Sequence, residues 1–185
     1  MKELSLNILD IVENSTKAKA KMISIEIDEA DTLLTIKIID DGVGMSYEIL
    51  RSVSDPFYTT RTTRKVGMGI PLFRMAAEQT GGKLVITSTH IDVDKDNHGT
   101  TVLASFNKSH IDFTPLGDIV STIVTLIQGH PNVDFAFKHS FGERLVYLDT
   151  REMRQVLEDV PLDSFEVLLW IKESLTEQYT EFNKK

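Results

Sequence analysis

Hydrophobic positions recur along the first half of the chain at two periods, one typical of helices and one typical of strands. Apolar residues spaced three and four apart predict a helix over residues 3–18, whose opposite face carries Asn7, Asp10, Asn14 and Lys17. The other elements predicted in this half are strands at 22–28, 33–39, 84–89 and 101–106, and helices at 47–53 and 70–80. The pattern therefore indicates an α+β fold.

A second part follows a predicted boundary near residues 107–114. Its pattern predicts a helix over 116–127 and a hairpin of strands at 133–137 and 145–148. Asp149 and Asp163 are the predicted caps of two further helices. We expect two domains, 1–108 and 109–185, with the small C-terminal helix-hairpin-helix part packed on the first because so small a core is marginal alone.

Composition removes several classes of function. The 185 residues carry a formal net charge of −8 and no cysteine, which excludes disulfide frameworks and thiolate metal sites. The acidic balance argues against nucleic acid as a partner, and no apolar run reaches the roughly 18 residues of a membrane span. Charges inside the N-terminal apolar stretch are not typical of a secretory signal. We therefore expect a cytoplasmic protein.

The polar face of the first predicted helix is one candidate site. The side-chain oxygen of Asn14 is a neutral hard ligand, suited to a magnesium ion that is already bound to phosphates. Asp10, one turn earlier, could orient or deprotonate a water or hydroxyl, and Lys17, one turn later, could meet a phosphate. A solvated helix face is the simpler alternative.

Two further candidate features begin or end at predicted strands. Asp41-Gly42-Val43-Gly44 follows a strand, where glycines admit a ligand ring and a carboxylate could accept from the amino group of adenine but not from guanine. An ordinary turn is the alternative reading of this stretch. Gly99-Thr100-Thr101 opens the last strand of the first part and carries little information alone.

The fourth feature is the basic stretch DPFYTTRTTRKVGMGIPL, residues 55–72. Gly67-Met68-Gly69 leads directly into a predicted helix, whose first N–H groups and dipole favour a phosphate. Arg61, Arg64 and Lys65 supply positive charge just before it. The chain lacks the P-loop and dinucleotide-binding motifs, so another kind of phosphate site is needed. A polar loop is the alternative.

Taken in order, these features resemble the boxes of one superfamily. Residues 10–18 look like its N box, 41–45 like its G1 box, 55–61 with 67–70 like its F box, lid and G2 box, and 99–101 like its last box. The resemblance is to the GHKL, or Bergerat-fold, ATP-binding superfamily. Its members include histidine kinases, MutL repair proteins, type II topoisomerases and the large heat-shock chaperone ATPase. It covers about residues 3–107.

The resemblance implies a two-layer α/β sandwich, in which helices cover one face of a mixed sheet and ATP with magnesium binds between the first helix and a lid at residues 59–69. Asp10 would then be catalytic, and Asn14 would bind magnesium. The residues expected to bind ATP are Asn14, Lys17, Asp41, Gly42, Gly44, Met45, Thr60, Arg61, Lys65, Gly67, Met68, Gly69 and Thr101.

The chain departs from the superfamily pattern in places. Asp10 stands where hydrolysing members carry glutamate, and Lys65-Val66 stands where kinases often carry another glycine. No helix pair with a phosphoacceptor histidine precedes residue 10, so we do not expect a self-phosphorylating sensor kinase. The C-terminal part resembles that of stand-alone bacterial GHKL proteins, some of which are encoded beside NADH-linked iron hydrogenase subunits.

Three functions stay open from the sequence. The chain could be a kinase-like regulator that phosphorylates an unidentified protein partner, in a hydrogenase or signalling pathway. It could be an ATPase whose lid closure changes a partner surface. It could also be a binding module that senses the nucleotide without catalysis. The kinase-like lid and Lys17 favour the first, and the repair-like Glu13-Asn14-Ser15 favours the second.

Overall fold

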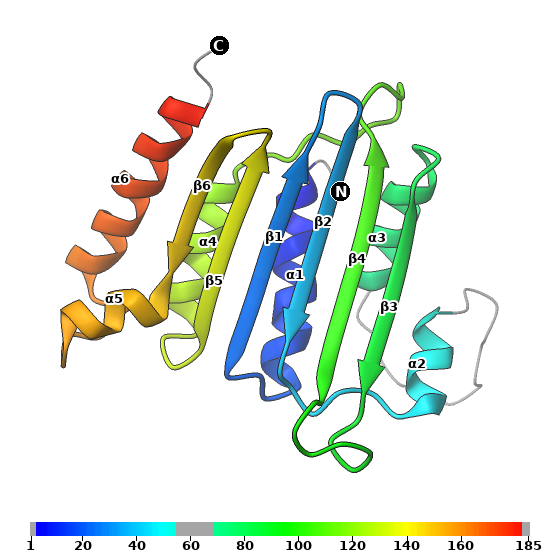
Figure 1. Ribbon diagram of the computed structural model, residues 1–185, viewed down its shortest axis with the longest axis horizontal. Coiled ribbons are helices and arrows are strands. Elements are labelled where there is room, and N and C mark those ends of the chain that lie inside the picture. The colour runs from blue at the N-terminus through cyan, green and yellow to red at the C-terminus, as the bar shows by residue number, and fades with distance from the viewer. Residues whose placement is uncertain (1–2, 55–68, 183–185) are drawn as a thin grey trace.

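The structure, a computed structural model, describes residues 3–54 and 69–182. Its elements are α1 (Leu4–Lys17), β1 (Met22–Glu29), β2 (Leu33–Asp40), α2 (Tyr47–Ser54), α3 (Gly69–Glu78), β3 (Lys83–Thr89), β4 (Gly99–Asn107), α4 (Ile119–Gly129), β5 (Asp134–Phe141), β6 (Arg144–Asp149), α5 (Thr150–Leu157) and α6 (Phe165–Phe182). A six-stranded sheet forms one layer, and α1, α3 and α4 cover one of its faces (Figure 1). This confirms the predicted α+β sandwich. No described helix is long and apolar enough to cross a membrane.

The six strands lie in the order β3-β4-β2-β1-β5-β6. Neighbouring strands are antiparallel except β1 and β5, which pair in parallel within the described sheet. In the centre, Ile25 of β1 pairs with Ile38 of β2 on one side and with Phe137 of β5 on the other. The mixed sheet predicted from the sequence is thus confirmed.

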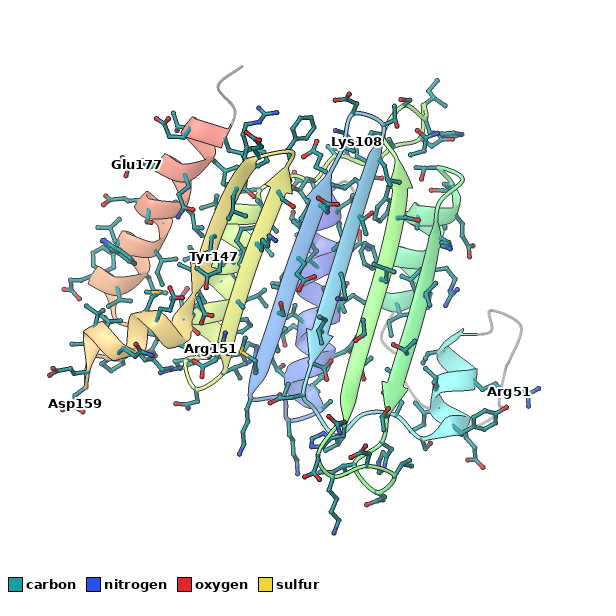
Figure 2. All side chains as sticks on the ribbon, viewed as in Figure 1. Arg51, Lys108, Tyr147, Arg151, Asp159 and Glu177 are labelled. Carbon is teal, nitrogen blue, oxygen red and sulfur yellow. The ribbon has the colours of Figure 1, made fainter. Side chains whose placement is uncertain are left out.

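The core lies between the sheet and the helices. Alternate side chains of β1 and β2 point to this side, and Ile23, Ile25 and Ile36 are completely buried there. No described helix lies over the opposite face, which carries mainly polar side chains (Figure 2). On this open face Lys37 Nζ lies 3.6 Å from Glu26 Oε2 in a half-exposed cross-strand pair. The alternation of hydrophobic and polar residues along the strands therefore predicts correctly which face of the sheet the helices cover.

The second part of the chain continues the same sheet. The predicted boundary at 107–114 falls in the connection between β4 and α4, but the hairpin β5–β6 pairs directly with β1. Phe135 and Phe137 of β5 are buried in the common core. The second part therefore packs on the first through strand pairing, and α6 lies beside β6 at the edge of the sheet (Figure 1).

A buried histidine joins this sheet to α6. His139 Nε2 lies 3.0 Å from Glu29 Oε2, and His139 Nδ1 lies 2.8 Å from the hydroxyl of Tyr179. Since a carboxylate only accepts, Nε2 carries the proton and the Tyr179 hydroxyl donates to Nδ1. Lys108 forms an ion pair with the same glutamate. Burial lowers the pKa of His139, although Glu29 opposes this, so the ring favours its neutral form.

The ends of the C-terminal helices correct two predictions. α4 begins at Ile119, because Gly117 has φ +80° and the Asp118 carboxylate caps the helix by accepting from Ser121 N at 2.9 Å. Asp149 caps α5 as predicted, accepting from Arg151 N. α6 begins only at Phe165, so Asp163 lies too early to be the residue directly before the helix.

Candidate functional site

A pocket opens on the helix side of the sheet, between α1, the end of β2, β4 and the start of α3. It is lined by Ile11, Asn14, Ser15, Ala18, Asp40, Gly44, Met45, Ile70, Thr100 and Val102. Three residues predicted from the sequence, Asn14, Gly44 and Met45, are therefore brought together. Apolar walls around a single carboxylate are typical of a site for a small organic molecule.

Asp40 supplies that carboxylate. Asp40 is the last residue of β2 and is only 8% exposed. Oδ2 accepts from the Ser15 hydroxyl at 2.6 Å, while Oδ1 accepts from Gly42 N at 3.0 Å and Thr100 N at 3.2 Å. A carboxylate offers about four acceptor positions, so these described donors leave about one, on Oδ2. Asp40 is thus fixed in place and can still accept a hydrogen bond from a ligand.

Asp41 points elsewhere. Its Oδ1 accepts from Lys21 N at 2.7 Å and from Met22 N at 2.9 Å, which ties the turn to the start of β1. The residue is exposed, and it lines a different pocket of about 530 Å³ that also includes open-face residues. Its position does not fit the adenine-binding role expected for it. Asp40, one residue earlier, has the geometry that this role needs.

The same shift of one residue occurs on β4. Thr100 lines the pocket, and its Oγ1 lies 2.9 Å from Ser88 Oγ. Thr101, the residue expected at the site, alternates to the open face and lines the other pocket. Thr101 is therefore absent from the lining on the helix side, although Asp40 and Thr100 border both pockets.

The glycines of the turn after β2 are required by close packing. Gly44 has φ +69°, and a Cβ there would lie 1.9 Å from Thr89 O. A Cβ on Gly42 would lie 2.9 Å from Ala18 O. Val43 N also donates to Ala18 O at 2.9 Å, which fastens the turn to the end of α1. Both glycines thus let the turn lie against its neighbours and shape one wall of the pocket.

Asp10 lies against the first residue of α3. A Cβ on Gly69 would lie 2.8 Å from Asp10 Cβ and 3.5 Å from its Oδ2, so the two helices touch here through a glycine. The Asp10 carboxylate is therefore close to the N-terminal end of α3, where N–H groups without helical partners and the helix dipole favour anions. Asn14, one turn further along α1, lines the pocket. Lys17 is exposed at the end of α1 and is absent from that lining.

Asn7 is buried, although the residue spacing places it on the polar side of α1 with Asp10 and Asn14. The residue is 1% exposed, and neither its amide nitrogen nor its amide oxygen has a hydrogen-bond partner among the described residues. α3 packs against α1, so part of the face that the spacing indicates as polar is covered. The sequence showed that Asn7, Asp10 and Asn14 share a side of α1, but not how deeply each is buried.

Five of the residues expected to bind ATP lie outside the described part of the chain. They are Thr60, Arg61, Lys65, Gly67 and Met68. Gly69 lies inside it and begins α3. In the part of the chain that the structure describes, no group of three or more His, Asp or Glu side chains is arranged to hold a metal ion. Asn14, which lines the pocket, has a side-chain oxygen that could serve as one ligand.

Comparison with known families identifies this arrangement. The model for the histidine kinase-, DNA gyrase B- and HSP90-like ATPases matches residues 2–110 of the 185. The chain belongs to this family. The matched residues contain α1, the turn after β2 and the start of α3, which are the elements that build the pocket. The resemblance read from the sequence is confirmed, and this part of the chain is an ATP-binding domain of the GHKL type.

Three known proteins match parts of the chain. The sensor protein KdpD of Clostridium acetobutylicum is 31% identical over 84 residues, which are 42% of this chain and 9% of KdpD. The N-terminal domain of a DNA repair protein is similar with a TM-score of 0.53 and 19% identity, over 80% of this chain and 53% of that one. The MutL ATPase domain of Aquifex aeolicus, complexed with ADP, is similar with a TM-score of 0.52 and 17% identity, over 85% of this chain and 70% of that one. The two structures support the fold.

Three residues that line the pocket, Ser15, Asp40 and Thr100, were not predicted as site residues, although the periodicity of their own elements indicates that they face the helix side. Asp40 is in phase with the buried Ile36 and Ile38 of β2, and Thr100 is in phase with Val102 of β4. Because side chains alternate across a strand, each should face the helices, whereas Asp41 and Thr101 should not. Ser15 also lies on the buried side of α1. The motif spacing predicted a turn that lines the pocket, and the strand alternation would have predicted which of its neighbours line it too.

Proposed function

We propose that the pocket binds the adenine ring of ATP and that Asp40 accepts a hydrogen bond from its amino group. The observation that carries this proposal is the buried Asp40 carboxylate, fixed by three donors and left with about one acceptor position. Guanine has a carbonyl in place of this amino group and would leave the carboxylate facing an acceptor. Selectivity for ATP over GTP follows from this geometry.

The phosphates would extend toward α3. Gly69 begins that helix beside Asp10, and Asn14 lies between this point and the adenine end. We assign Asn14 as a ligand of magnesium, which would neutralise phosphate charge when bound. The resemblance adds residues that would contact the phosphates or form the lid, namely Lys17, Thr60, Arg61, Lys65, Gly67 and Met68. It also adds Gly42, Gly44 and Met45, which would lie beside the adenine ring.

We infer that the reaction is phosphoryl transfer to a protein partner. Asp10 accepts the proton of the attacking hydroxyl or imidazole while the γ-phosphoryl group passes to that atom and ADP leaves. The likeness to the sensor protein KdpD supports a role in signalling. Two alternatives are an ATPase switch, in which water takes the place of the partner, and a nucleotide sensor without chemistry. We place the protein in the cytoplasm, with no role for membrane or nucleic acid.

The test is incubation of the full chain with ATP labelled at the γ-phosphate, with and without cell extract. Label on an extract protein supports transfer, and its loss in Asp10→Asn ties transfer to the proposed base. Label released as free phosphate without extract favours the ATPase switch. No release and no labelled protein, together with tight ATP binding by calorimetry, would leave the sensing module as the function.

A further inference from the structure

Helix α6 buries one apolar side, and it also carries large apolar side chains on the outer side, which no described residue covers. Its buried face packs against β6 and α4 through Val167, Leu168, Ile171, Leu175 and Phe182. Its outer face nevertheless exposes Phe165 by 74%, Trp170 by 55% and Leu169 by 44%. A helix that packs by one face normally carries polar residues on the other. Large exposed apolar side chains gathered on one helix indicate a surface that another molecule covers.

The apolar side chains of this outer face stand among carboxylates. Between residues 158 and 177 the chain carries six acidic residues and a single basic one, Lys172. The acidic residues, all exposed, are Glu158, Asp159, Asp163, Glu166, Glu173 and Glu177. Glu177 points outward from α6, away from the sheet, and Asp159 lies at the bend between α5 and α6 (Figure 2). At 3.6 residues per turn, Glu166 and Glu173 lie in the middle of the outer side of α6, so its apolar side chains stand among carboxylates and are not ringed by them.

The surface is also held in shape without a partner. Leu162, in the bend before α6, is 1% exposed and fixes this segment in the core. Leu168 N donates to Ser164 O at 3.0 Å, so helical bonding starts at the residue before the helix. Phenylalanine and tryptophan lose few rotatable bonds when they are covered, and tryptophan dominates many protein interfaces. The exposed face of α6 is thus preorganised for binding.

We propose that the outer face of α6 docks a protein partner whose contact surface combines apolar side chains with lysine or arginine. Arginine or lysine over the indole of Trp170 would add a cation–π contact. A second copy of this chain fits poorly, because a two-fold contact would bring Glu166, Glu173 and their neighbours against the same residues. An anionic membrane surface would be repelled for the same reason.

This surface is separate from the nucleotide site. α6 lies beside β6 at one edge of the sheet, whereas the pocket is built by α1, β2, β4 and α3 (Figure 1). Docking at α6 therefore does not depend on which reaction takes place at the pocket. A docking surface of this kind would bring a partner to the chain whichever of the three activities applies.

The single tryptophan of the chain makes the surface directly measurable. Trp170 is the only tryptophan among the 185 residues, so its emission reports on this face alone. The probe is a synthetic tryptophan-free helix with leucine on one side and arginine on the other. We expect a saturable blue shift of emission at 1:1 stoichiometry, weakened by 0.5 M salt. A peptide with the same leucines and glutamate for arginine should give no shift.

Single substitutions then show whether the peptide binds to the outer face of α6. Phe165→Gln and Glu173→Lys should each weaken binding by about 10- to 30-fold, the loss typical of a central interface residue. Ile111→Gln is the matched control, because Ile111 is 94% exposed and lies in the connection between β4 and α4. All three changes are at exposed positions, and unchanged melting temperature and ATP affinity would show that fold and pocket are intact.

Four results would overturn the proposal. The first is no shift with the arginine peptide at 100-fold excess, and the second is an equal shift with both peptides. The third is a blue shift that appears when the protein alone is concentrated, with a dimer in sedimentation, which would make the occupant a second copy. Equal weakening in Ile111→Gln would also contradict it, because binding would then not be located on α6.

Discussion

Two adjacent aspartates allow a sharp test of the nucleotide site. The change is Asp40→Asn in one protein and Asp41→Asn in another, so that each loses one charge and keeps its size. In Asp40→Asn the new side chain can still accept from Gly42 N and Thr100 N through its oxygen. Its amide nitrogen, however, would replace Oδ2 and present a donor toward the amino group of adenine. Only the first change should therefore harm ATP binding.

The magnitude follows from the loss of a hydrogen bond to a charged acceptor. Such a bond contributes about 1.5–3 kcal/mol, which corresponds to roughly a 10- to 150-fold weaker ATP affinity. For Asp41→Asn we expect less than about a threefold change, because the amide oxygen of the new side chain can accept from Lys21 N and Met22 N in place of the carboxylate. The assay is isothermal titration of ATP with magnesium into each of the two variants and the unchanged protein.

Thermal unfolding without nucleotide serves as the control for the fold, since Asp40 also holds the turn together. GTP supplies a second control, and we expect the unchanged protein to bind it far more weakly than ATP. An affinity loss in Asp41→Asn equal to that in Asp40→Asn would refute the reasoning. So would an Asp40→Asn protein that is stable and binds ATP with unchanged affinity.

Three further predictions concern catalysis, the turn and the buried histidine. Asp10→Asn should keep ATP affinity within a few-fold but remove most phosphate release or transfer, as measured with labelled ATP. Gly44→Ala should cost about 1–3 kcal/mol or more in urea unfolding, because its φ is +69° and its Cβ would meet Thr89 O; Gly81→Ala, with φ +76° and no atom within 4 Å, should cost less. Burial lowers the pKa of His139 below that in the unfolded chain, so unfolding free energy should fall as the pH drops below about 6.5. His139→Gln should flatten that dependence, and an unchanged urea midpoint between pH 7.5 and 5.5 would contradict it.

Local pattern in the sequence predicted the elements well, because each is specified by its own residues. The three- and four-residue spacing in α1 and the alternation in β1, β2 and β4 are direct consequences of which side each element buries. The glycine pair after α3 also has a local cause, since Gly81 adopts φ +76°. Motif order then identified the family, because four short boxes stand in sequence on the expected elements.

Contacts between distant segments were harder to predict. Nothing in the local pattern of β5 indicates that it pairs with β1, because parallel pairing leaves no turn between the strands to mark it. The burial of Asn7 was likewise not predictable from α1 alone, because α3 and α4, both distant in the sequence, pack against this helix. The choice of Asp41 rather than Asp40 has another cause, because the prediction used the motif spacing alone and did not continue the strand alternation, which places Asp40 on the helix side, into the turn.

The parallel pairing of β1 with β5 also has a consequence for synthesis of the chain. Ile25 pairs with Phe137, so one side of β1 has no partner until the ribosome has added more than a hundred further residues. At about 5–20 residues per second this takes roughly 6–20 s. During this interval a row of isoleucines stands on an unpaired strand edge, which can join another nascent chain on the same messenger. Premature termination near residue 110 would make this exposure permanent and should yield an aggregating fragment, although it contains every described residue that lines the pocket.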